Sequence, residues 1–394
     1  MLTRDDLLAL DADDLLAQHR ERFDLPDGLI YLDGNSLGAQ LKSVPAAAGV
    51  VLDEWQSQLI GGWRQAGWWE LPLAVGDRIG RIVGAAPGQV LACDTTTINL
   101  YKTISAAVAL RPDRSVILTE EIGFPTDLYI VDSVAERTGR TVRSVPRGES
   151  VADHLDDSVA VVVLGHVDFR TAALLDIPST TTALHDAGAL VVWDLSHSAG
   201  VVPIGLDAAD ADFAVGCTYK YLNGGPGAPA YLYVNQRILS ETSQPLQGWL
   251  GHADPFLMPS KYQPAPGVRR FLTGTQPIVS MRVLDASLDA YADVDVAVVR
   301  AKSTRLTDLF IQLVDERCAG MGLDLLSPRL AESRGSQVSL RHRDAVPMYE
   351  RLVANGVRGD FRSPDILRFG FAPLYVSYVD VWDAAEILQA VLQQ

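Results

Sequence analysis

The sequence lacks the features of several broad classes of protein. It has no cluster of Lys and Arg, and its formal net charge is −16 at pH 7. Affinity for nucleic acids and for anionic membranes depends on clustered cations, so the charge argues against both partners. No apolar run reaches the roughly 18 residues that a membrane-spanning helix requires. The acidic first 23 residues lack the apolar core of a secretion signal.

Cysteine is scarce as well. Cys93, Cys217 and Cys318 are odd in number, far apart and not in Cys-x-x-Cys spacing. This pattern argues against a disulfide framework and a cysteine metal site, and it predicts buried thiols in a cytoplasmic protein. Gly-x-Gly-x-x-Gly and P-loop motifs are also missing, which favours a single phosphate group over a nucleotide as an anionic ligand.

Short apolar runs alternate with helical patterns through the middle of the chain. The predicted strands cover 115–120, 160–167, 189–194, 212–217 and 229–234. Helical stretches follow Pro125 and precede Gly188. This alternation predicts an α/β fold with a mainly parallel sheet covered on both faces, in which ligands bind at the carboxyl ends of the strands.

The pattern changes after about residue 275. One long helix is predicted over 278–316, followed by a strand, a helix, a strand and a helix. We therefore expect an N-terminal segment (1–60), a large domain (61–277), and a connecting helix with a small C-terminal α/β domain (278–394).

A lysine stands between two tyrosines in "GCTYKYLNGGPGAPAYLYV" (216–234), just after a predicted strand. A lysine amine that burial or nearby cations activate forms imines with carbonyls, including the aldehyde of pyridoxal phosphate. That cofactor also needs an acid beside its pyridine nitrogen. Asp194 ends another strand 26 residues before Lys220, so both side chains are expected at one end of the sheet. Alone, Lys220 is typical of a surface lysine and Asp194 of a strand-end cap; together they make a cofactor site a competing interpretation.

Other residues near these strand ends have both an ordinary and a functional interpretation. Thr95, Thr96 and Thr97 begin an amphipathic helix, where threonine caps are common, but the same helix start offers N–H groups and hydroxyls to a phosphate. Phe124 precedes a helix and is either a core residue or a stacking surface for a flat ring. His197 follows Asp194 by three residues and is either structural or a hydrogen-bond partner of that site.

Arg368 alternates with apolar residues in "DILRFGF". Most arginines in such strands are exposed or ion-paired. If the side chain faces the site, its planar fork suits the carboxylate of a substrate.

With these residues assembled, the chain resembles the kynureninase family of fold-type-I pyridoxal-phosphate enzymes. The resemblance covers nearly the whole chain. It rests on these segments, which follow the family's order and approximate spacing: "YLDGNSLG" (31–38), "FPTD" (124–127), "DLSHSAG" (194–200), "YKYLNGGPG" (219–227), "GWLGH" (248–252) and "FLTGTQPI" (271–278).

The resemblance implies a large domain with a mainly parallel seven-stranded sheet and a role for each matching residue. Lys220 would hold pyridoxal 5′-phosphate as an imine, Asp194 would pair with its pyridine nitrogen, and Tyr219 would donate a proton. The residues implied to bind the cofactor are Thr96, Thr97, Phe124, Asp127, Thr171, Asp194, His197, Tyr219 and Lys220, with Trp249 and Thr275 reaching the phosphate from the neighbouring subunit of a homodimer. The residues implied to bind the substrate are Asn35, Ser36, Trp63 and Arg368.

The implied reaction is hydrolysis of L-kynurenine to anthranilate and L-alanine by cleavage of the Cβ–Cγ bond, without a metal. Two positions depart from the family's usual pattern, Ala172 where glycine is common and Leu250 where a second tryptophan is common. Trp63 and Thr275 resemble the bacterial form that prefers kynurenine over its 3-hydroxy derivative.

Two alternatives stay open. The first is another fold-type-I enzyme, such as a cysteine desulfurase or a class V aminotransferase. A desulfurase needs a cysteine on a mobile loop, and Cys318 is the only late candidate, without a Gly/Ser-rich loop around it. The second is a non-catalytic scaffold that keeps the fold, against which the joint presence of Lys220, Asp194 and Arg368 argues.

Overall fold

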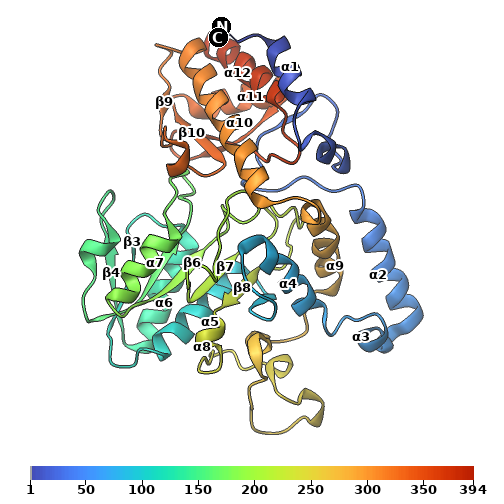
Figure 1. Cartoon of the computed structure of the whole chain (residues 1–394), viewed down its shortest axis with the longest axis vertical. Coiled ribbons are helices and arrows are strands. Elements are labelled where there is room, and N and C mark those ends of the chain that lie inside the picture. Colours follow the sequence, from blue (N-terminus) through green and yellow to red (C-terminus); the bar gives the residue numbers. More distant parts are fainter. Residues whose placement is uncertain (1) are drawn as a thin grey trace.

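A seven-stranded sheet forms the centre of the larger part of the molecule in the computed structural model, which describes residues 2–394 (Figure 1). In spatial order its strands are β2 (Val90–Ala92), β8 (Tyr231–Val234), β7 (Phe213–Gly216), β6 (Leu190–Asp194), β5 (Val159–Gly165), β3 (Val116–Glu120) and β4 (Thr141–Val145). Only β8 is antiparallel to its neighbours, so the other six strands share one direction. The predicted α/β fold with a mainly parallel seven-stranded sheet is therefore confirmed.

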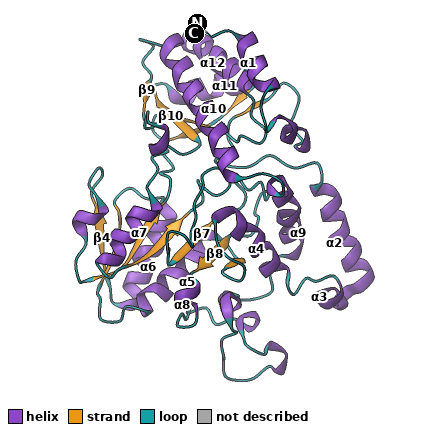
Figure 2. Ribbon diagram, viewed as in Figure 1, coloured by secondary structure: helices purple, strands orange, loops and turns teal. Residues whose placement is uncertain are grey.

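Helices cover both faces of this sheet (Figure 2). They are α4 (Leu71–Val83), α5 (Thr96–Ala109), α6 (Pro125–Thr138), α7 (Ile177–Asp186), the short α8 (Gln236–Leu239) and α9 (Ile278–Ser287). Alternate residues of β6 pack into two separate apolar cores: Val191 and Trp193 share one with α4 and α7, and Leu190 and Val192 share the other with α5 and α6. Burial on both faces explains why this strand is apolar at consecutive positions.

A smaller unit lies above the sheet in Figure 1 and contains both chain termini. Its antiparallel sheet has the order β12 (Asp360–Arg362), β13 (Ile366–Gly370), β10 (Gln337–Arg341) and β9 (Asp324–Leu325). Its helices are α10 (Val296–Arg317), α11 (Ala345–Ala354) and α12 (Tyr378–Leu392). Each strand and helix predicted for this part of the sequence is present.

The long helix predicted over 278–316 is wrong as a single element. The chain forms α9, a 3₁₀ turn at Leu288–Tyr291, and then α10. Asp295 begins α10 as its N-cap, because its side chain accepts a hydrogen bond from Ala297 N (2.8 Å). An N-cap residue has a non-helical backbone, so the continuous helix is interrupted here.

The N-terminal segment connects the two units. α1 (Arg4–Ala12) packs on α12, β1 (Ile30–Tyr31) pairs with β11 (Val357–Arg358), and α2 (Val44–Gln58) packs on α9 near the short α3 (Gly62–Gln65).

Between β1 and α2 the chain passes beside the lysine of the 216–234 segment. Gly38 N donates to Tyr219 O (2.7 Å), and a Cβ on Gly38 would lie 2.3 Å from Lys220 O. Only glycine allows so close an approach of two backbones.

None of the helices formed by residues 2–394 has the length and apolar character needed to cross a membrane. All three cysteines are free thiols and are buried, as predicted.

Candidate active site

Two neighbouring parallel strands bring Asp194 and Lys220 together. β6 ends at Asp194, whose partner in register on β7 is Val215, and Lys220 follows the end of β7 by four residues. The carboxyl ends of parallel strands meet at one edge of the sheet, so the 26 residues between the two side chains do not separate them in space. Both line a cavity of about 210 Å³, called here the lysine cavity.

Most of the predicted cofactor residues line the same cavity. Its lining is Thr95, Thr96, Thr97, Phe124, Thr126, Asp127, Asp194, Ser196, His197, Tyr219, Lys220, Gly227, Ala228 and Ala230. These residues come from five separate stretches of sequence. The cavity therefore combines a lysine, two acids, hydroxyls and aromatic rings in one space.

Lys220 is only 9% exposed and contacts a histidine. Its Nζ lies 2.8 Å from His197 Nε2. Burial, and then the charge of Lys220, lower the pKa of His197 well below its ordinary value, so the imidazole is neutral. A neutral ring accepts at Nε2 from the lysine and carries its hydrogen on Nδ1, which has no partner among residues 2–394.

The two acids of the cavity differ in their support. Asp194 Oδ1 accepts hydrogen bonds from Ser196 N (2.9 Å) and Ser196 Oγ (2.6 Å), which fix the carboxyl group at the end of β6. Asp127 is 5% exposed, and within the described chain its Oδ1 has no hydrogen-bond partner. Burial, and then the charge of Asp194, raise the pKa of Asp127 well above its ordinary value. The site thus holds one carboxyl group fixed by hydrogen bonds, Asp194, and one whose Oδ1 accepts no hydrogen bond, Asp127.

Aromatic rings flank the lysine. Nζ of Lys220 lies 5.9 Å from the ring centre of Phe124 and 6.0 Å from that of Tyr219. The nearby Cys217, and then burial, raise the pKa of Tyr219, so its hydroxyl keeps its proton at neutral pH. Tyr221, in contrast, is buried away from the cavity, and its hydroxyl donates to Ser336 O (2.9 Å).

The start of α5 forms one side of the cavity. Thr95 is the N-cap, and its side chain accepts from Ile98 N (3.3 Å). Thr96 and Thr97 are the first residues of the helix, where backbone N–H groups have no partner within the helix. A helix start with hydroxyl groups beside a cavity is suited to a phosphate.

Arg368, Asn35 and Ser36 form a second cluster, between the N-terminal segment and the small unit. Arg368 is 1% exposed, its Nε donates to Asp360 Oδ1 (2.6 Å), and its Nη2 donates to Ser36 Oγ (3.2 Å). Asn35 Nδ2 donates to Gln337 Oε1 (2.9 Å).

This second cluster reaches the lysine cavity through one residue. Arg368 Nη1 donates to the carbonyl of Phe169, and the ring of Phe169 packs edge-on against Phe124, with centroids 5.2 Å apart. The arginine therefore lies one aromatic ring beyond the wall of the lysine cavity.

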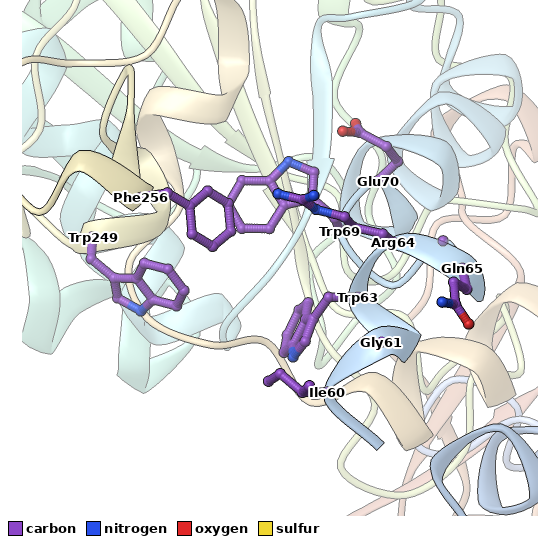
Figure 3. Close-up of a pocket in the computed structure, with 10 residues that line it drawn as sticks. Ile60, Gly61, Trp63, Arg64, Gln65, Trp69, Glu70, Trp249 and Phe256 are labelled. Carbon is purple, nitrogen blue, oxygen red and sulfur yellow. The ribbon is translucent and has the colours of Figure 1, made fainter. Parts of the chain in front are cut away.

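Four predicted site residues lie elsewhere in the single chain. Trp63 and Trp249 line another cavity of about 620 Å³ together with Trp69 and Phe256. Figure 3 shows the rings of Trp63, Trp249 and Phe256 directed toward one space, which we call the aromatic cavity. Its lining shares no residue with that of the lysine cavity.

The other two are Thr171 and Thr275. Thr171 Oγ1 donates to Asp168 Oδ1 (2.8 Å) and lines a third cavity, next to Arg170. Thr275 is exposed. The structure thus brings together the residues around Lys220 and leaves this group apart.

Sequence reasoning missed two supporting residues. Ser196 fixes Asp194, and its position two residues after an Asp at a strand end is a usable signal for a local side-chain cap. Asp360 accepts from Arg368 across the β12–β13 hairpin. The eight-residue spacing of this pair carries no signal until the hairpin register is known.

Comparison with known proteins now identifies the family. The chain is 49% identical over 399 residues to a kynureninase of Burkholderia pseudomallei (strain 1106a), and the match covers 100% of this chain and 96% of that protein. It is 46% identical over 401 residues to the kynureninase of Pseudomonas fluorescens, with the same coverage. The chain belongs to the kynureninase family. A sequence model of the kynureninase C-terminal domain also matches residues 299–388.

Solved structures extend the similarity of this kynureninase-family chain to a wider fold. The cysteine desulfurase CsdA of Escherichia coli superposes with a TM-score of 0.78 at 21% identity, covering 96% of this chain and 98% of that one. A C-DES mutant with glycine covalently linked to its PLP cofactor superposes with a TM-score of 0.80 at 16% identity, covering 94% and 98%. At such identities the likeness establishes the shared fold-type-I architecture and no more.

The residues of the lysine cavity fit pyridoxal phosphate. Asp127 Oδ1 and His197 Nδ1 are buried without partners, and a buried lysine, a fixed carboxyl group and a helix N-terminus surround the same space. An aldehyde, a pyridinium nitrogen and a phosphate call for this donor and acceptor set. Nowhere in residues 2–394 do three His, Cys, Asp or Glu side chains gather as metal ligands.

Proposed function

We propose that this chain hydrolyses L-kynurenine to anthranilate and L-alanine at the lysine cavity, with pyridoxal 5′-phosphate as its cofactor. Family membership at 46–49% identity over the whole chain supports the reaction. The observation that carries the location is the contact of 2.8 Å between Lys220 Nζ and His197 Nε2, inside a cavity that Asp194 also lines.

The cofactor would be held by residues from three sides of the cavity. Lys220 would bind its aldehyde carbon, and Asp194 would bind its pyridine nitrogen because Ser196 holds this carboxyl group in place. Phe124 would cover the ring face. Thr96, Thr97 and Tyr219 would bind the phosphate or the polar edge, with Asp127 and His197 supplying polar contacts. Thr171 lines the third cavity and is not among the residues that line this one. When bound, the cofactor supplies an electron sink for charge that develops on substrate carbon atoms.

The chain's own residues move protons in this scheme. Lys220 Nζ takes the proton from the substrate α-carbon, and the neutral His197 Nε2 orients that amine. Tyr219 Oη keeps its proton at neutral pH, and its position in the cavity makes it the proposed proton donor. Water supplies OH to the γ-carbonyl carbon and H to the β-carbon as the bond between them breaks, which yields anthranilate and alanine.

Arg368 would bind the substrate carboxylate. Its Nε and Nη2 donate to the two carboxylate oxygens of Asp360, and Nη2 also donates to Ser36 Oγ. These contacts hold the guanidinium in one orientation, so the substrate carboxylate would bind on the Nη1 side. Asn35 and Ser36 would shape the pocket beside it.

We further propose a homodimer in which Trp63, Trp249 and Thr275 complete the neighbour's site. Trp249 is 44% exposed and Phe256 is 58% exposed, and both belong to the aromatic cavity, which opens on the surface. Exposed aromatic residues in one patch are typical of subunit interfaces. Within one chain these residues lie apart from the lysine cavity, which a shared site would explain.

The division into 1–60, 61–277 and 278–394 and a cytoplasmic location remain proposals. Support for the division comes from the two separate sheets and from the N-terminal segment, which packs on the small unit through α1 and β1. Support for the location comes from three buried cysteines without a disulfide.

The positions of the cysteines argue against the desulfurase alternative. Cys93, Cys217 and Cys318 are all buried, with Cys318 only 4% exposed at the end of α10. A persulfide-forming cysteine must reach the substrate from a mobile loop, and none of the three is on an exposed loop.

The deciding experiment adds L-kynurenine to the cofactor-loaded protein and follows anthranilate fluorescence, with Lys220→Ala as the inactive control. We expect anthranilate from the wild type and none above background from the variant. A loaded wild-type protein that forms no anthranilate would contradict the proposal. A protein without visible cofactor absorbance would favour the scaffold alternative.

Substrate preference is tested separately. We expect a higher kcat/KM for L-kynurenine than for 3-hydroxykynurenine, since Trp63 and Thr275 resemble the bacterial form of the family. A clear preference for the hydroxylated substrate would contradict this assignment without affecting the reaction type.

A further inference from the structure

A fully buried lysine lies beneath the start of α5. Lys102 is 0% exposed, and its Nζ donates to Asp94 Oδ2 (2.6 Å) and to Phe271 O (2.8 Å). Burying an ammonium is costly unless it is paired and hydrogen-bonded. Lys102 is outside the lining of the lysine cavity, so none of the steps above uses it.

Asp94, its partner, adopts a backbone conformation that is uncommon for a non-glycine residue, with φ +48°. It immediately precedes the N-cap Thr95, so its conformation sets the direction in which the chain enters α5. Asn99 Nδ2, from the same buried helix face as Lys102, donates to Cys93 O (2.9 Å). Two side chains of α5 thus hold the turn that presents the helix's own first residues, Thr96 and Thr97.

The same carboxylate also holds a distant segment. Thr273 Oγ1 donates to Asp94 Oδ1 (3.0 Å), and Asp94 N donates to Gln276 Oε1 (3.3 Å). With Lys102 bound to Phe271 O, the segment 271–276 is attached at three points. Thr275 lies within this segment.

Trp249 is fixed through the same segment. A Cβ on Gly248 would lie 2.2 Å from Thr273 O, so the two backbones are in direct contact, and Leu250 N donates to Thr273 O (3.2 Å). A shift of Thr273 therefore displaces Gly248 and the tryptophan that follows it.

From this geometry we infer that Lys102 and Asp94 are positioning residues that couple the two halves of the shared active site. This inference rests on the proposed function. One side of the pair orders Thr96 and Thr97, which bind the cofactor phosphate in this chain. The other side orders Trp249 and Thr275, which meet the phosphate of the neighbouring chain. Cofactor affinity and dimer association are therefore linked through one buried ion pair, and loss of the pair weakens both.

The chain offers a matched control for a purely structural role. Lys302, in α10, is 6% exposed, and its Nζ contacts Asp14 Oδ2 (2.7 Å) and donates to Pro373 O (2.7 Å). This pair has the same chemistry as Lys102 with Asp94 and Phe271 O, but it joins α10 to the N-terminal and C-terminal segments and lines neither the lysine cavity nor the aromatic cavity.

The experiment compares Lys102→Met, Thr273→Val and Lys302→Met as full-length proteins. Pyridoxal phosphate affinity is measured by titration of the visible absorbance, and the dimer dissociation constant by sedimentation at several protein concentrations. We expect Lys102→Met to weaken both by roughly tenfold or more, because an unpaired buried charge disturbs both segments. Thr273→Val removes one hydrogen bond and no charge, so both constants should weaken by about threefold.

Lys302→Met should lower the Tm yet leave both constants within about twofold of wild type. Equal effects of Lys102→Met and Lys302→Met, or a change in only one of the two constants, would overturn the inference. If Lys102→Met does not fold, the same comparison is made between Thr273→Val and Lys302→Met. A wild type that binds no pyridoxal phosphate refutes the proposed function itself, whereas a wild type that binds it and variants that bind equally well refute only the coupling.

Discussion

The lysine cavity and the aromatic cavity differ in size, in exposure and in the residues that line them. The first is small and has buried ionisable side chains, among them Asp194 and Lys220, and parallel strand ends define it. The second is about three times larger, lined by tryptophans and phenylalanine, and open on the surface. The sheet edge positions reacting groups within one chain, whereas the aromatic surface is suited to contact with another molecule. In the proposed function the reacting groups belong to the first cavity and the subunit contacts to the second, and variants in each cavity test this assignment.

The largest effect should come from the chemistry of Lys220. Lys220→Arg keeps the charge and much of the length, but a guanidinium stays protonated and cannot form the cofactor link. We expect a loss of kcat of at least ~10³-fold, since a covalent link and a proton-transfer step are lost together. Steady-state anthranilate assays measure it. Lys42→Arg, at an exposed position, is the control, and activity near wild type in Lys220→Arg would contradict the assignment.

A smaller effect is expected at the aromatic cavity. Trp249→Ala removes a half-exposed ring of the proposed interface, so dimer dissociation and cofactor affinity should weaken by roughly tenfold, as for a central aromatic interface residue. Sedimentation and absorbance titration measure the two constants. Tyr129→Ala removes a more exposed ring, from α6, and should change neither. An intact dimer with normal cofactor affinity would remove Trp249 from the proposed interface.

A buried acid of the lysine cavity, Asp127, should contribute to the pH dependence of stability. The raised pKa of Asp127 means that the folded protein binds this proton more tightly than the unfolded chain. The contribution of Asp127 to wild-type stability therefore falls as pH rises above the ordinary carboxyl pKa of 3.8, and Asp127→Asn avoids this loss. The cofactor-free variant should be more stable by about 1–2 kcal/mol at pH 7, with the gap closing toward pH 4.

Urea unfolding of cofactor-free protein at several pH values measures this gap. Asp132→Asn changes an exposed carboxyl of the same helix and should leave the pH profile unchanged. The stability gained by Asp127→Asn should be accompanied by weaker cofactor binding. A gap that is independent of pH would show that Asp127 is not held as a protonated carboxyl group.

The smallest effect concerns a position outside both cavities. Ala172 has φ +63°, a left-handed conformation that costs a residue with a Cβ about 1 kcal/mol. Ala172→Gly should therefore raise the free energy of unfolding by about 0.5 kcal/mol after the entropy of the unfolded chain is counted, with kcat unchanged. Urea unfolding measures it. Ala173→Gly, at a neighbour without positive φ, should destabilise, and the reverse order of the two variants would contradict the explanation.

Much of the fold and the centre of the site could be predicted from the sequence. The apolar runs that end at Asp194 and just before Lys220 determine two parallel strands, and sheet geometry then places both side chains together. The predicted small-domain strands and helices also follow from local pattern. Local pattern failed at Asp295, where a side-chain cap interrupts helical periodicity without a glycine or proline to indicate it.

Contacts between distant segments could not be predicted in this way. The ion pair of Arg368 with Asp360 depends on hairpin register, and the contact of Thr273 with Asp94 joins residues 179 apart in the chain. The separation of Trp249 from the lysine cavity depends on the path of a long irregular segment. The residue types at these positions suit many surroundings, so tertiary packing decides which one they occupy.

The path of residues 32–38 has a consequence for biosynthesis. This stretch contacts Tyr219 through Gly38 and Gly370 through Leu32, whose carbonyl accepts from Gly370 N (2.7 Å). Its docking surface is therefore incomplete until the last strand, β13, has been translated. A ribosome-bound chain can form the central sheet early, but residues 32–38 have their complete docking surface only when almost the entire polypeptide has been made.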